Sequence, residues 1–179
     1  MSVRALELGR APEQFQLYDL STAPAGEQAK YRHWVKQHSK LYKAMLLKYA
    51  SITPNKWALN KPTFDDLKDQ KNTMNLAEVF AFLGDFQINK LCKVRKDEVK
   101  RIITLINQGS QRCQMELDLD GFTEFVLQLG HFLHEDKTAP PSVFLPQLFK
   151  HFSKVSLKAD KPLFQRLFED LPHGSSELQ

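Results

Sequence analysis

The chain has 179 residues, enough for one sizeable core, and its composition of 42% apolar and 26% charged residues is that of an ordinary globular protein. No apolar run approaches the ~18 residues of a membrane span, the N-terminus has no apolar signal segment, and the cysteines are too few for a disulfide framework. The net charge is +4, and from the two cysteines and the missing apolar segments we expect a cytoplasmic protein with no membrane span.

Residues 1–26 are expected to form a flexible arm, because Pro12, Pro24 and Gly26 interrupt any regular element. From 27 to 50, apolar residues recur three and four positions apart, which predicts one amphipathic helix. Its apolar face comprises Tyr31, Trp34, Val35, His38, Leu41, Tyr42, Met45, Leu46 and Tyr49. The opposite face carries the basic residues of this segment.

Basic residues are concentrated in one part of the chain. Between Gln28 and Phe64 the sequence has eight basic residues and no acidic one, which leaves 17 basic against 21 acidic residues elsewhere. Surfaces without a charged partner usually mix both signs. We therefore predict that this segment meets an anionic partner, the alternative being a solvated helix face that pairs with the chain's own acids at 116–124.

Further helices are predicted along the rest of the chain. Asn75 followed by Glu78 is a capping-box pattern, which marks the start of an apolar helix. The expected helices cover approximately 64–70, Leu76–Phe86, Arg95–Asn107, Asp120–Leu133, 143–153 and 162–171. The last two are expected to form a helical hairpin. The residues 27–171 would then be a single helical domain, followed by a disordered tail over 172–179.

Residues 74–133 alternate helix and short extended stretch in the rhythm of an EF-hand pair. Ile88 and Leu117 lie where the loops of such a pair exchange their β-bridge, and DEVKRIITLI followed by LDGFTEFVLQL looks like the two helices of a second hand. This third of the chain resembles the degenerate EF-hand modules of microtubule-associated, ciliary and centriolar proteins. The resemblance implies an all-α fold with an EF-hand-like pair at its centre, flanked by the amphipathic helix and the C-terminal hairpin.

The loops of this expected pair lack the ligands that calcium requires. An EF-hand loop supplies oxygens from positions 1, 3, 5, 9 and 12, the last from a bidentate Glu. With Leu117 at the bridging position, the ligand positions fall on Ser110, Arg112, Gln114, Asp118 and Gly121. Because an Arg repels a cation and the bidentate Glu is absent, we expect no calcium, no other metal and no cofactor.

Catalytic motifs are missing from the sequence. It has no phosphate-binding glycine loop and no Gly-x-Ser-x-Gly motif. His131 and His134 lie near Glu135 and Asp136, but without a third ligand at metal-binding spacing they favour a solvated helix end. Cys92 is expected to be an inert, buried thiol. The sequence therefore predicts a protein that is not an enzyme.

These patterns predict a structural or adaptor protein. The residues expected to contact its acidic partner are Lys30, Arg32, Lys36, Lys40, Lys43 and Lys48. The family resemblance implies that this partner is tubulin or an axonemal protein, with a location on the cytoskeleton, in a cilium axoneme or at a basal body. Two alternatives stay open: an EF-hand-like module that binds an amphipathic helical peptide, and a nucleic-acid-binding protein, which no recognition motif favours.

Overall fold

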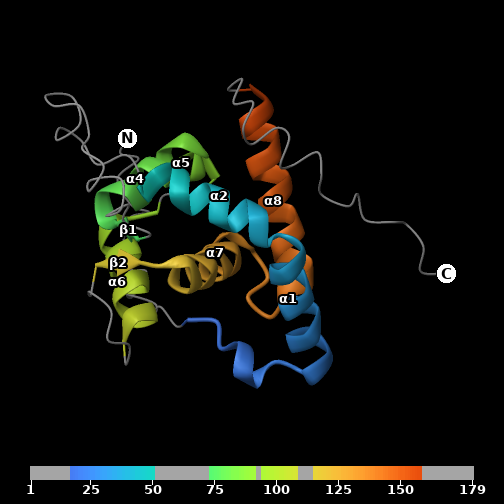
Figure 1. Ribbon diagram of the computed structural model, residues 1–179. Helices are drawn as coiled ribbons and strands as arrows, with labels where there is room; N and C mark the ends of the chain where they lie inside the picture. The colour runs from blue at the N-terminus through green and yellow to red at the C-terminus, as the bar shows by residue number, and fades with distance from the viewer. Residues whose placement is uncertain (1–16, 51–72, 92–93, 109–114, 159–179) are drawn as a thin grey trace, which may run out of the picture.

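The computed structural model describes residues 17–50, 73–91, 94–108 and 115–158, and this part of the chain is mostly helical, as predicted (Figure 1). Its elements are η1 (Leu20–Thr22), α1 (Ala25–Gln37), α2 (Ser39–Ala50), β1 (Met74–Asn75), α4 (Leu76–Asp85), α5 (Ile88–Leu91), α6 (Lys96–Asn107), β2 (Glu116–Leu117), α7 (Leu119–Leu133) and α8 (Pro141–Lys158). The helices expected near 64–70 and 162–171 and the tail lie outside the described residues. The second half of the predicted C-terminal hairpin, 162–171, is therefore not described.

The single helix predicted over 27–50 is wrong, because the structure has two helices with a bend between them. At His38 the backbone has φ −97° and ψ 10°, whereas a regular α-helix has ψ of about −42°. After the bend, α2 leaves α8 and runs across α7 toward α4 (Figure 1). Only one residue departs from helical geometry, so the apolar spacing on both sides still resembles one continuous helix.

The predicted β-bridge between Ile88 and Leu117 is also wrong. Leu117 of β2 pairs antiparallel with Met74 of β1, and Asn75 pairs with Glu116. Ile88 instead begins the short helix α5. The preceding residue, Gln87, has a positive φ of 55°, a left-handed conformation that ends α4 and turns the chain away from an extended path.

Side-chain caps start the helices that follow the two strands. The predicted capping box of α4 is confirmed, since Asn75 Oδ1 accepts from the Glu78 amide at 3.0 Å and Glu78 Oε2 accepts from the Asn75 amide at 2.7 Å. At α7, Asp118 Oδ1 accepts from the Gly121 amide at 2.8 Å. Each bridging residue thus stands immediately before an N-cap, Met74 before Asn75 and Leu117 before Asp118.

Helix α8 is longer than the predicted 143–153. It begins at Pro141, a residue that suits the first helical position because the amide it lacks would have no partner there. Pro146 lies inside the helix without ending it. Phe149, Phe152 and Val155 are buried three residues apart, so packing against the core continues past the predicted end.

Aromatic side chains from four helices meet in the core. The ring of Phe82 on α4 lies 5.5 Å from Tyr49 of α2, 5.4 Å from Phe122 of α7 and 5.6 Å from Phe152 of α8. All four side chains are fully buried. Helix α7 lies at the centre of the fold and packs against α2, α6 and α8 (Figure 1).

The N-terminal segment is held on α7 where the structure describes it. The buried side chain of Gln128 accepts from the Tyr18 amide at 2.8 Å and donates to the Tyr18 carbonyl at 2.9 Å. Leu17, Tyr18 and Leu20 pack against the core. None of the helices described combines the length and the apolar character needed to cross a membrane.

Candidate functional site

The six basic residues singled out from the sequence all lie on α1 and α2. Lys30, Arg32, Lys36, Lys40 and Lys43 are exposed, whereas Lys48 is half-buried. Tyr31, Leu41, Tyr42, Met45, Leu46 and Tyr49 are buried on the inner side of the same two helices. Because the inner side packs into the core, the exposed cations are held on the outer side of the molecule.

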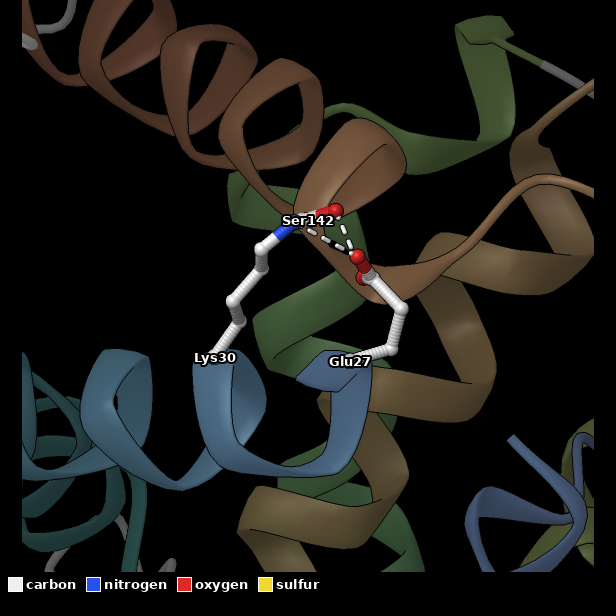
Figure 2. Close-up of polar contacts among 3 residues, drawn as sticks. All are labelled: Glu27, Lys30 and Ser142. Carbon is white, nitrogen blue, oxygen red and sulfur yellow. Dashed lines mark hydrogen bonds and ion pairs between the residues drawn. The ribbon is translucent and has the colours of Figure 1, made fainter. Parts of the chain in front are cut away.

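Lys30, one of the predicted contact residues, forms an ion pair within the chain. Its Nζ lies 2.8 Å from Glu27 Oε1, while Glu27 Oε2 accepts from Ser142 Oγ at 2.7 Å (Figure 2). These hydrogen bonds from Lys30 and Ser142 lower the pKa of Glu27 below its usual value, which keeps the carboxylate charged. Glu27 therefore links the start of α1 to the start of α8, and it offsets the charge of Lys30.

Lys48 also differs from the other predicted contact residues. Its ammonium lies 5.6 Å from the ring centroid of Tyr49, within reach of a cation–π interaction. Because Lys48 is half-buried, less of its side chain is open to a partner than in the exposed cations. The remaining four exposed cations, Arg32, Lys36, Lys40 and Lys43, are called the basic surface below.

No residue of the basic surface forms an ion pair with any part of the chain that the structure describes. Arg32 Nη2 donates to the neutral side chain of Gln28 at 3.3 Å. Two acids of the 116–124 region are engaged elsewhere: Asp118 caps α7, and Glu116 accepts from Thr73 Oγ1 at 3.0 Å. Among the described residues, the alternative in which these acids neutralise the basic surface has no support.

A second basic segment, which the sequence analysis missed, lies beside α1. Residues 137–159 contain Lys137, Lys150, Lys154 and Lys158 and no acidic residue. This segment includes α8, which packs against α1 (Figure 1). Lys150 and Lys154 are exposed. The absence of acidic residues from 137–159 could have identified this segment from the sequence, as the absence of acidic residues identified the first basic segment.

Aromatic contacts hold the bend between α1 and α2 in place. His38 is 4% exposed, its ring stacks on Trp34 with centroids 3.9 Å apart, and its Nδ1 lies 2.7 Å from the Trp34 carbonyl oxygen. Phe149 of α8 contacts both rings edge-on. Burial lowers the pKa of His38 below its usual value. The neutral imidazole therefore serves packing at this bend and adds no charge to the basic surface.

The histidines near the end of α7 take part in local hydrogen bonds. His131 Nε2 lies 3.1 Å from the Lys137 carbonyl oxygen, and His134 Nδ1 lies 3.0 Å from the Asp136 carbonyl oxygen. Lys137 Nζ donates to the carbonyls of Phe132 and His134, both at 2.7 Å. A cation at the last carbonyls stabilises a helix C-terminus. These contacts fit the helix end predicted from the sequence.

No group of three or more His, Cys, Asp or Glu side chains within 17–50, 73–91, 94–108 and 115–158 is arranged to hold a metal ion. Cys92, the thiol considered in the sequence analysis, lies outside these ranges. The chain matches no family model, no curated protein and no solved structure.

Proposed function

We propose that the protein is a structural adaptor, without enzymatic activity, that binds an acidic protein surface through Arg32, Lys36, Lys40 and Lys43. The observation that carries this proposal is the state of these four side chains: they are exposed, and none forms an ion pair with a described residue. Like charges spaced along a helix are unfavourable for the free protein. A partner with carboxylates facing these positions removes that repulsion.

The proposed partner is the acidic lattice of a microtubule in a cilium, flagellum or centriolar structure. The basic surface extends across two helices, and an extended lattice offers carboxylates along that length. Each exposed ion pair contributes little, about 0.2–1 kcal/mol, so several must form together. The resemblance of residues 74–133 to EF-hand modules of microtubule-associated proteins points to the same class of partner.

An EF-hand-like pair at the centre of the fold is part of this proposal. The β1–β2 bridge supports it, because each strand leads directly into a helix and the two strands pair antiparallel. With β1 paired to β2, one hand consists of the entering helix α6, the loop strand β2 and the exiting helix α7. The strand β1 and the helix α4 are the loop strand and the exiting helix of the other hand. Met74 replaces Ile88 as the bridging residue of the first loop.

This register leaves both loops poorly suited to calcium. With Met74 at the bridging position, the first loop has Leu67 and Lys71 at two ligand positions and Glu78 at the bidentate one. One oxygen of Glu78 already accepts from the Asn75 amide at 2.7 Å. The second loop has Gly121 where the bidentate Glu would stand. The proposed role of the pair is therefore to support α2 and the basic surface.

Charge reversal tests the proposed function. Changing Arg32, Lys36, Lys40 and Lys43 together to Glu is expected to weaken binding to polymerised tubulin at about 0.1 M salt by about 30- to 1000-fold, because four contacts of about 0.5–1 kcal/mol each are lost. Co-sedimentation over a range of tubulin concentrations gives the dissociation constant. Circular dichroism and the melting temperature show whether the variant folds.

A matched control carries the same change of charge elsewhere on the surface. Lys90 on α5 and Lys96, Lys100 and Arg101 on α6 are also exposed, and their reversal to Glu should change the affinity less than about 3-fold, since screening limits charge effects beyond about 10 Å. Equal losses in both variants would mean that only net charge matters. Tighter binding of the wild-type protein to duplex DNA than to tubulin would favour the nucleic-acid alternative instead.

A further inference from the structure

A groove of about 240 Å³ lies between α1 and the start of α8. Its apolar lining includes Tyr31 and Trp34 from α1 and Leu145 from α8. Lys30 and Ser142, both of which are bound to Glu27 (Figure 2), are also among the residues that line it. The groove is smaller than the roughly 300–1,000 Å³ of most small-molecule pockets, so its size suits a single large side chain better than a cofactor.

The rims of this groove lead into the basic surface. His33 and Gln37 are exposed lining residues on α1, and Lys36 follows His33 by three residues on the same helix. Residues three or four apart lie on the same side of a helix. Pro146 forms part of the rim on α8, and Lys150 follows it by four residues. No described side chain that lines the groove is acidic.

An apolar floor beside exposed cations complements a peptide with one apolar side chain and flanking carboxylates. We propose that the groove between α1 and α8 binds an acidic segment of the partner protein, with one phenylalanine-sized side chain placed against Tyr31, Trp34 and Leu145. This inference rests on the proposed function and makes it more specific: the basic surface attracts the partner, and the groove selects a segment that carries an apolar anchor.

Two synthetic peptides test the groove separately from the charges. Both are ten residues of glutamate and serine, and they differ only in a central phenylalanine or serine. The full-length protein with Trp57→Phe retains Trp34 as its only tryptophan, so its fluorescence reports on the groove. We expect the phenylalanine peptide to bind about 10- to 100-fold more tightly than the serine peptide, since it buries one large apolar side chain, and to shift the Trp34 emission.

Two variants then distinguish the groove from the basic surface. Gln37→Phe, at an exposed rim position, fills the groove, and it should bring the two peptides to within about 2-fold of each other without changing the affinity for the serine peptide. Reversal of Arg32, Lys36, Lys40 and Lys43 to Glu should weaken both peptides by the same factor and preserve the preference for phenylalanine. If only the expectation for the charge reversal fails, the result counts against the proposed function, and the proposal that the groove binds an apolar side chain still stands.

Several outcomes would overturn the inference. Equal affinities of the wild-type protein for the two peptides would show that the groove takes no anchor, and a preference that persists in Gln37→Phe would place the anchor elsewhere. A dimer that sedimentation detects for the wild-type protein and not for Gln37→Phe would make a second copy the occupant. The chain's own C-terminal segment contains the acidic residues Glu169 and Asp170. If changing both to Lys makes the phenylalanine peptide bind 10-fold more tightly, this segment is the occupant of the groove.

Discussion

Replacement of Phe82 by alanine is expected to lower the free energy of unfolding by about 3–5 kcal/mol, the usual cost of truncating a buried phenylalanine. Phe82 is fully buried, and its ring contacts Tyr49, Phe122 and Phe152 from three other helices. The cavity left by the ring cannot close by moving one helix alone, because these three rings belong to three different helices. Urea denaturation followed by circular dichroism measures the change.

The control for Phe82 is a large apolar residue that the structure leaves in solvent. Val143 on α8 is 42% exposed, so Val143→Ala should change the stability by less than about 0.5 kcal/mol. A loss of less than about 1 kcal/mol in Phe82→Ala would contradict the packing of α2, α4, α7 and α8 around this side chain.

Gly130→Ala is expected to destabilise the protein by up to about 2 kcal/mol, although alanine usually favours a helix over glycine by about 1 kcal/mol. A Cβ at Gly130 would lie 2.8 Å from Phe144 Cδ2, closer than carbon atoms approach without displacement. The Phe144 ring is 1% exposed and is surrounded by Tyr18, His131 and His134. Because the ring has little room to move, the cost of overpacking between α7 and α8, about 1–3 kcal/mol, exceeds the gain in helix propensity.

Gly84→Ala provides the matched comparison for this prediction. Gly84 lies in α4, is exposed, and would present its Cβ to open space. The same substitution should therefore raise the stability there by about 0.5–1 kcal/mol. Thermal unfolding of both variants should give melting temperatures on opposite sides of the wild-type value. A stabilising Gly130→Ala would mean that α7 and α8 approach less closely than described.

A local sequence signal predicted the start of α4, because the chemistry of a helix cap is local. The capping box of Asn75 and Glu78 depends on residues three apart, and it identified the start of α4. The cap of Asp118 on Gly121 has the same spacing. The β-bridge between Met74 and Leu117 joins residues far apart in the chain, and the resemblance to an EF-hand pair had favoured Ile88. The recurrence of an apolar residue directly before an N-cap, in Met74–Asn75 and in Leu117–Asp118, was the signal that marked the correct pair.

The exposure of the basic residues could be predicted from the sequence, whereas the ion pair of Lys30 and the groove beside α1 could not. Helical spacing placed Arg32, Lys36, Lys40 and Lys43 opposite the apolar face, and the structure leaves these four exposed. The ion pair of Lys30 could not be anticipated in full, because Glu27 is oriented by Ser142, which lies 115 residues away in the sequence. The groove depends likewise on the packing of α8 against α1, a contact between distant segments that composition and spacing do not encode.

The variant Lys40→Glu tests whether the basic surface exists for a partner or is only a solvated helix face. Lys40 lies in the first turn of α2, which has no acidic residue, and it stands between Lys36 and Lys43. A carboxylate there benefits from the helix N-terminus by about 0.3–1 kcal/mol and from Lys43, three residues on in the same helix, by about 0.2–0.5 kcal/mol. The free protein should therefore become more stable by about 0.5–1.5 kcal/mol.

Stability and affinity for polymerised tubulin should thus change in opposite directions in this one variant. We predict a higher melting temperature together with binding that is weaker by about 5- to 10-fold, since one cationic contact becomes repulsive. Unchanged binding in a stabilised Lys40→Glu protein would contradict the proposal that this surface serves an acidic partner.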